Sequence, residues 1–208
     1  MSSSSSYELY YLETHGLGLL ARILLSMGGF EWSDMFPKNW SEEKATTPLG
    51  KLPVLTETRA DGTKFVLAES SAIYSYIARK AKLHGDTEEE SALIDQFYSS
   101  WYSTVVSGRQ SRNLRESNPE QYKVEYSKYL EKELRPTLAK HEQHLASTSS
   151  GYYVGNKLSF VDIATKMAVD RINSHEVEIT EQAYPHIYKL VQEVSELEVV
   201  KEQLSRFG

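Results

Sequence analysis

The chain has 208 residues, 40% of them apolar and 25% charged, which suits a globular protein of one domain or two small ones. Its net charge of −6 argues against nucleic acid or an anionic membrane surface as a partner. The absence of cysteine excludes disulfides, a Cys nucleophile and thiolate metal sites, so thiol chemistry would need a sulfur brought by the substrate. No signal peptide or membrane-spanning stretch is visible, and we expect a cytoplasmic location.

The first 82 residues predict alternating strands and helices. We expect a strand over 7–12, a helix over 19–27, a strand over 30–35 and a short helix between 41 and 45. Asp61-Gly62 predicts a hairpin between a strand that begins near residue 52 and one over 64–68. A helix over 71–82 should turn Ile73, Tyr76 and Ile77 inward. This order indicates an α/β domain over 1–82.

Residues 83–208 predict an all-helical domain, entered through a linker at 83–86. Helices are expected over 87–115, 119–147, 159–174, 180–194 and 196–206. Pro136 and Pro185 are positions where a helix kinks or splits. Ser159 and Asp162 have capping-box spacing, which favours a structural role for Asp162 over a catalytic one. His141 and His144 are too few for a metal site, and we expect them on a solvated helix face.

The stretch from 47 to 71 carries the strongest functional signal. Pro53 stands at a strand entrance after a Gly-Lys turn, where a cis peptide bond is expected. Such a bond would leave the amide and carbonyl of Leu52 free to pair with an outside peptide. Glu69 and Ser70 begin a helix, whose unpaired amides and positive partial charge favour a carboxylate. These pieces predict a receptor for a small peptide with an α-amino acid head.

In that light the chain resembles the cytosolic glutathione transferases, most closely the tyrosine-type sigma and mu classes. The resemblance covers nearly the whole length and implies a thioredoxin-like first domain followed by an all-helical second one. Its motifs are the strand Tyr7-Glu8-Leu9-Tyr10-Tyr11-Leu12, the pair Trp40 and Lys44, the segment Gly50-Lys51-Leu52-Pro53, the pair Glu69-Ser70, and the capping box at 159–162. Any one of these motifs is weak, but all of them in order are strong.

The resemblance assigns a role to each of these motifs. It implies that Tyr11 is catalytic, that Trp40 and Lys44 grip the glycyl carboxylate of glutathione, and that the 50–53 segment pairs with the cysteinyl part. Lys51 itself stays ambiguous, because a lysine in a turn is usually exposed. Glu69 and Ser70 would hold the γ-glutamyl head. Three positions depart from the family pattern. His15 replaces an arginine, Leu17 replaces the sigma-class arginine but matches the mu class, and Glu69 replaces the Gln of both classes. The resemblance still implies that Leu17 belongs to the glutathione-binding set.

The chemistry of a tyrosine agrees with this assignment. A thiol with pKa near ~8.5 is mostly protonated at neutral pH, whereas the thiolate is the nucleophile. A phenol with pKa near ~10 stays protonated and can donate a hydrogen bond to that thiolate. Fourteen tyrosines are present, so an isolated tyrosine would be read as a core aromatic; the flanking pattern favours Tyr11. Its rival Tyr10 should face the other side of the strand.

We therefore expect a homodimeric glutathione transferase that conjugates the thiol of glutathione, its co-substrate, to a small hydrophobic electrophile without a metal. A glutathione-dependent isomerase and a non-catalytic ligand carrier of the same fold are the alternatives. Asp95 could reach the glutathione of a neighbouring subunit, as acids there do in relatives, or be a plain surface acid. Tyr102, Val106 and Arg109 share one helix face and could line the electrophile pocket or form a core stripe.

Overall fold

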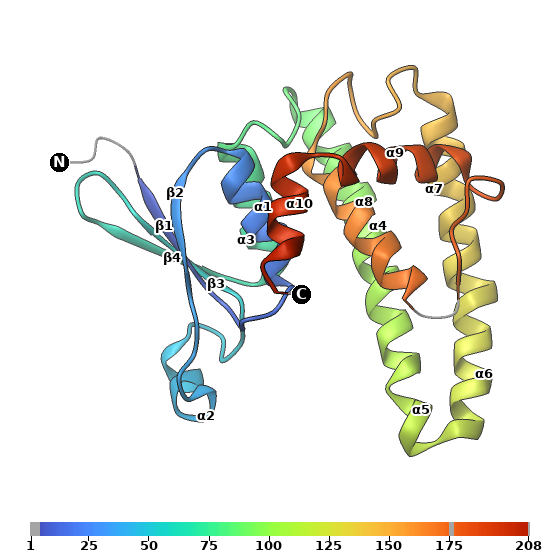
Figure 1. Ribbon diagram of the computed structural model, residues 1–208, viewed down its shortest axis with the longest axis horizontal. Helices are drawn as coiled ribbons and strands as arrows, with labels where there is room; N and C mark the ends of the chain where they lie inside the picture. The colour runs from blue at the N-terminus through green and yellow to red at the C-terminus, as the bar shows by residue number, and fades with distance from the viewer. Residues whose placement is uncertain (1–4, 175–176, 208) are drawn as a thin grey trace. The chain divides into compact units, whose positions relative to one another are not determined.

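The computed structural model describes residues 5–174 and 177–207, and the chain forms two compact units (Figure 1). The first unit extends to His84 and takes in the chain again from Glu196, whereas the second is Gly85–Ser195. This grouping differs from the predicted division at residue 82 in residues 83–84 and in the last helix. That helix, α10 (Glu198–Ser205), packs against α1 (Gly18–Met27) of the first unit.

The first unit is built on a four-stranded sheet with the order β2-β1-β3-β4. Its strands are β1 (Ser6–Tyr10), β2 (Glu31–Met35), β3 (Val54–Thr58) and β4 (Lys64–Ala68). β1 runs parallel to β2 and antiparallel to β3, and β3 and β4 form the predicted hairpin. In the register of the sheet, Tyr10 is the partner of Val54, and Val54 is the partner of Ala68.

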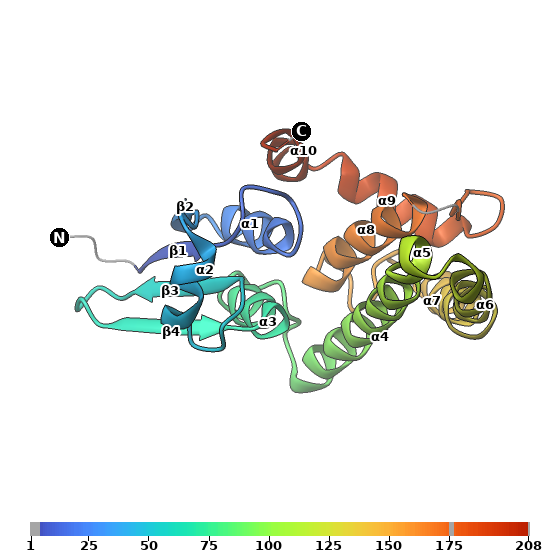
Figure 2. The same ribbon diagram turned by 90° about the horizontal axis from the view of Figure 1, so that it is seen from below.

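Two helices cover one face of this sheet, as Figure 2 shows. α1 ends at the predicted glycine pair, and α3 (Ser70–Lys80) follows β4 directly. Leu9, Leu55, Ile73 and Ile77 are fully buried between the layers, where aliphatic burial supplies most of the stabilisation. The prediction for Tyr76 was wrong in one respect: Tyr74 is the buried tyrosine of α3, and Tyr76 lies half-buried with its hydroxyl on Glu57.

The second unit is helical, as predicted. It contains α4 (Glu88–Arg112), α5 (Leu114–Ser117), α6 (Pro119–Tyr129), a π-helical turn (Leu130–Leu134), α7 (Arg135–Ser147), α8 (Phe160–Asn173) and α9 (Pro185–Ser195). The π turn interrupts the predicted long helix just before Pro136, where the missing amide donor disturbs regular pairing. The helix predicted over 180–194 begins only at Pro185, which suits a first helical position.

The predicted capping box is confirmed at the start of α8. The Ser159 amide donates a hydrogen bond to the Asp162 carboxylate at 2.7 Å, and this carboxylate also accepts a hydrogen bond from the amide of Tyr153 at 2.9 Å. Burial raises the pKa of Asp162, whereas these hydrogen bonds act to lower it. Both contacts serve the helix start and the loop before it, so Asp162 is a structural residue.

Candidate active site

Tyr11 is the first residue after β1, at the edge where the strand meets the loop to α1. Its amide donates to the carbonyl of Met35 at 3.0 Å, which extends the pairing with β2 by one residue, and its side chain is 8% exposed. The Tyr11 hydroxyl oxygen accepts a hydrogen bond from the amide of Leu17 at 2.9 Å. Because a phenol has one proton to donate and lone pairs to accept with, this contact leaves the Tyr11 proton free for another acceptor.

The loop between Tyr11 and α1 fits closely around the phenol ring. A Cβ atom at Gly16 would lie 2.4 Å from the Tyr11 hydroxyl oxygen, and one at Gly18 would lie 2.5 Å from its ring. Gly16 also has a φ of +34°, which other residues rarely adopt. Leu17, 41% exposed, is fixed from a second side, since the Tyr74 hydroxyl donates to its carbonyl.

Arg22 of α1 supports the same loop, and the sequence prediction missed it. Its guanidinium is fully buried and donates to the carbonyls of Thr14 at 2.7 Å and Leu12 at 3.1 Å. Its Nε pairs with Asp34 of β2 at 2.8 Å, which compensates the buried charge. The available signal was an arginine inside the most apolar segment of the chain.

The second element of the site is the turn before β3. The peptide bond between Leu52 and Pro53 is cis, as predicted. Among the described residues, no backbone hydrogen bond involves the amide or carbonyl of Leu52. Gly50 turns the chain with φ +64°, and Lys51 after it has 75% of its side chain exposed. The turn therefore offers one free backbone donor and one free acceptor beside Pro53.

The third element is the junction of β4 and α3. Glu69 has φ +70° and ψ 119°, an uncommon conformation for a residue with a side chain, and its carbonyl accepts the first helical hydrogen bond from Ile73. Ser70 at the first helical position is buried. The Glu69 carboxylate is half exposed and lies 3.8 Å from the ammonium of Lys51. This contact joins the junction to the turn before β3.

The sheet register gathers these three elements at one place. Tyr10, Val54 and Ala68 are successive cross-strand partners, so the residues just beyond them share one edge of the sheet. Those residues are Tyr11, Pro53 and Glu69. The phenol, the free backbone of Leu52 and the start of α3 therefore border one another within the first unit.

Trp40 and Lys44 lie on a small helical segment after β2. α2 (Trp40–Glu43) and the 3₁₀ turn Lys44–Thr46 bury none of their residues. Trp40 contacts the edge of the Tyr10 ring at 6.4 Å between centroids, and a Cβ at Gly50 would lie 3.6 Å from Cε of Lys44. Lys44 thus extends over the turn that leads to Leu52.

Tyr10 anchors this segment rather than competing with Tyr11. Its hydroxyl donates to one oxygen of Glu43, and the other oxygen accepts the amides of Lys38 at 3.0 Å and Asn39 at 2.8 Å. Burial and this bond to a carboxylate raise the pKa of Tyr10 to about 12. Tyr10 is therefore a neutral donor that ties the start of α2 to β1.

The remaining predicted residues lie on α4 in the helical unit. Asp95 is half-buried, Tyr102 and Arg109 are exposed, and Val106 is intermediate. The core stripe of α4 is made by other residues, namely Ile94, Tyr98, Trp101, Thr104, Gly108 and Ser111. Tyr102, Val106 and Arg109 are thus not the core stripe that was the alternative for them.

The solvated positions predicted for His141 and His144 were wrong. The His141 ring is 2% exposed, with Nδ1 2.7 Å from the Tyr153 hydroxyl and Nε2 2.9 Å from the Ser100 hydroxyl. Burial lowers the pKa of His141 to about 4, and the charge of His144 acts in the same direction. His144 lies 2.7 Å from the Tyr153 carbonyl and stacks on that ring. The helix face expected to meet water faces α4 and the loop before α8 instead.

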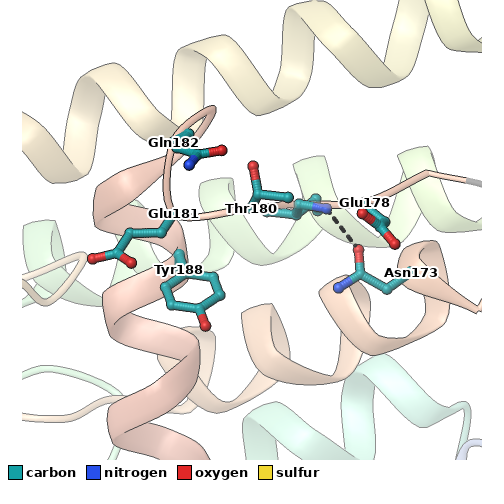
Figure 3. Close-up of a pocket in the computed structure, with 7 residues that line it drawn as sticks. Asn173, Glu178, Thr180, Glu181, Gln182 and Tyr188 are labelled. Carbon is teal, nitrogen blue, oxygen red and sulfur yellow. Dashed lines mark hydrogen bonds between the residues drawn. The ribbon is translucent and has the colours of Figure 1, made fainter.

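A separate cavity of about 430 Å³ lies in the helical unit between the end of α8 and α9 (Figure 3). Glu178, Glu181 and Tyr188 line it, and the Ile179 amide donates to Asn173 at its rim. It contains no predicted site residue. Within residues 5–174 and 177–207, no group of three acidic, His or Cys side chains is placed to hold a metal ion, and no helix there is long and apolar enough to cross a membrane.

Comparisons with known proteins agree with this geometry. Residues 109–206 match the family model described as the glutathione S-transferase C-terminal domain. Glutathione S-transferase 1 of Ascaris suum is 30% identical over 207 residues, covering 96% of this chain and 95% of that protein. Glutathione S-transferase 4 of Caenorhabditis elegans is 31% identical and covers 76% of each chain. A solved glutathione S-transferase of Caenorhabditis elegans has a TM-score of 0.83 at 26% identity, with 98% of this chain and 99% of that chain covered. The chain therefore belongs to the glutathione S-transferase family.

Proposed function

We propose that Tyr11 activates the thiol of glutathione in this transferase by donating a hydrogen bond from its hydroxyl to the sulfur, which stabilises the thiolate. The observation that carries this role is the hydrogen bond from Leu17 to the Tyr11 oxygen, which leaves the phenol proton free. A hydrogen bond to an ionised sulfur favours the thiolate over the thiol. The thiolate sulfur then forms a bond to the electrophilic carbon, from which the leaving group departs with its electron pair, and the thiol proton goes to water.

The edge of the sheet suits a γ-glutamyl tripeptide. The free amide and carbonyl of Leu52 can pair with the cysteinyl backbone, which brings the sulfur toward Tyr11. The Ser70 hydroxyl and the first amides of α3 suit the α-carboxylate, and the exposed Glu69 carboxylate suits the α-ammonium. Trp40, Lys44 and Lys51 supply an indole N–H and two cations for the glycyl carboxylate.

We propose that the second substrate is a small apolar electrophile and that Tyr102, Val106 and Arg109 of α4 contact it. Their support is that each has exposed surface on a helix whose core stripe is made by other residues. We further propose a cytoplasmic homodimer in which Asp95 approaches the partner subunit's glutathione. These proposals rest on membership of the family. We also propose that the boundary between the two domains lies near residue 82.

The assignment of Tyr11 is tested by comparing two neighbouring tyrosines with glutathione and an aryl halide. Tyr11→Phe should lower kcat by ~10²-fold, since loss of one donor to a developing anion costs that much, with little change in KM for glutathione. Tyr10→Phe should instead keep kcat and raise KM for glutathione, because the lost hydroxyl anchors Glu43 and α2. Unchanged kcat in Tyr11→Phe would overturn the proposal, whereas equal losses of kcat in both variants would mean that neither hydroxyl has a specific role.

A further inference from the structure

The segment after α10 docks onto the elements that carry Tyr11. A guanidinium nitrogen of Arg206 lies 2.8 Å from one oxygen of Asp34, and another donates to Gln203 at 3.0 Å. Gln203 is buried and reaches the Ser26 hydroxyl of α1 at 3.4 Å. The end of α10 is therefore held against both α1 and β2 of the first unit.

Arg206 and Phe207 complete the surroundings of the buried ion pair between Arg22 and Asp34. Asp34 shares its two oxygens between Arg22 and Arg206, so the carboxylate meets two cations. The Phe207 ring lies 4.5 Å from the Arg22 guanidinium, and the Tyr11 ring lies 5.9 Å from it. Such contacts between a cation and an aromatic face are worth more when water is excluded.

A chain of contacts leads from this pair to the Tyr11 hydroxyl. The other two guanidinium nitrogens of Arg22 donate to the carbonyls of Thr14 and Leu12, which lie at the start of the loop after Tyr11. The same loop ends at Leu17, whose amide holds the Tyr11 oxygen at 2.9 Å. The orientation of the phenol proton thus depends on where Arg22 holds the loop.

We propose that Arg206 and Phe207 are positioning residues for Tyr11, acting through Arg22 and Asp34. This inference rests on the proposed role of Tyr11 in activating the thiol. Removing the Phe207 ring or the Arg206 charge would open Arg22 and Asp34 to water and weaken their hold on the loop. The phenol would then be less well aimed, and small misplacements of a catalytic group lower the rate strongly.

The alternative is that these residues only fasten α10 to the first unit. In that case their loss would lower the melting temperature and leave the chemistry of the folded protein unchanged. The pKa of the thiol of bound glutathione, measured from the ultraviolet absorbance of the thiolate against pH, separates the two. Among the described residues, the charged or titratable groups that face Arg22 and Phe207 are Asp34, Arg206, His15 and Tyr11.

The experiment compares Phe207→Ala, Phe207→Tyr and Arg206→Ala with Lys201→Ala as control. Lys201 is exposed on α10, and among residues 5–174 and 177–207 its ion pairs are with Glu196 and Glu198 and not with Asp34. We expect Phe207→Ala and Arg206→Ala each to lower the ionisation constant of the bound thiol, and kcat, by about three- to tenfold, with KM for glutathione changed less than about twofold. Phe207→Tyr and Lys201→Ala should match the unmodified protein in all three values.

The inference would be overturned if Phe207→Ala and Arg206→Ala had the same bound-thiol pKa and the same kcat as the unmodified protein, with or without a lower melting temperature. Tyr11→Phe measured alongside distinguishes this failure from that of the proposed function. If Tyr11→Phe loses ~10²-fold in kcat and Phe207→Ala and Arg206→Ala match the unmodified protein, only the positioning role fails. If Tyr11→Phe retains full activity, the role of Tyr11 and the inference fail together.

Discussion

Glu69 has a backbone conformation that glycine would adopt more readily. Whether glycine or alanine at this position gives the more stable protein therefore tests for backbone strain at the site. A residue with a side chain in such a sparsely populated region costs of order 1–3 kcal/mol, which glycine avoids. Glycine instead loses about 0.4–1 kcal/mol relative to alanine through its freer unfolded chain. Both Glu69→Gly and Glu69→Ala lose the contact with Lys51, so that loss cancels between them.

We therefore expect Glu69→Gly to be more stable than Glu69→Ala by about 1 kcal/mol in chemical unfolding. The matched control is exposed Lys123 within α6, where the alanine variant should be the more stable one by about 1 kcal/mol. If alanine were also the better residue at position 69, the strain argued from the φ of +70° would be refuted.

Glu69→Gln removes the charge of the side chain and keeps its shape, so it tests whether the Glu69 carboxylate binds glutathione. A charge-assisted hydrogen bond contributes roughly 1.5–3 kcal/mol and a neutral one about 1, so glutathione should bind roughly 2–30-fold more weakly. Turnover at saturating glutathione should be largely retained, because the contact is remote from the sulfur. Equal dissociation constants in calorimetric titration would mean that Glu69 does not touch the ligand.

Three further predictions concern stability and assembly. His141 is buried and has a pKa of about 4, so as the pH falls its ring takes up a proton in the unfolded chain before it does so in the folded protein. The free energy of unfolding should therefore fall by about 3 kcal/mol between pH 6.5 and 4. His141→Gln should show a smaller fall over this range in denaturant titrations. Burial acts to raise the pKa of Glu57, but hydrogen bonds from Tyr76 and Lys80 lower it to about 2. The ionised Glu57 therefore stabilises the fold fully above about pH 4.3, and this contribution is lost as the pH falls toward 2. Glu57→Gln should not show that loss of stability in acid, and an acid unfolding profile equal to that of the unmodified protein would refute the role of Glu57. Sedimentation at micromolar concentration should give a dimer, and a monomer there would also remove the role proposed for Asp95.

Local rules predicted the parts of the fold that depend on neighbouring residues. The Asp61-Gly62 hairpin, the glycine end of α1, the cis bond before Pro53 and the capping box of α8 each follow from a few adjacent residues. The three elements at the sheet edge could be found for the same reason, because strand ends and helix starts can be read from short segments. Their convergence at one edge follows from the register of three neighbouring strands.

Features set by distant partners could not be predicted in this way. Arg22 is buried because Asp34 and Phe207 reach it from β2 and from the segment after α10. His141 is buried because Tyr153 and Ser100 supply its hydrogen bonds from outside its own helix. Hydrophobic periodicity treats histidine and arginine as surface residues, so it predicts exposed positions for two side chains that are buried.

Titration of the thiol of bound glutathione shows whether the Tyr11 hydroxyl stabilises the thiolate. In the unmodified protein the pKa of the bound thiol should lie about two units below the ~8.5 of a free thiol. In Tyr11→Phe it should return most of the way toward the free value, while calorimetry shows glutathione still bound with similar affinity. A thiol pKa that is equally low in both proteins would mean that the Tyr11 hydroxyl does not stabilise the thiolate.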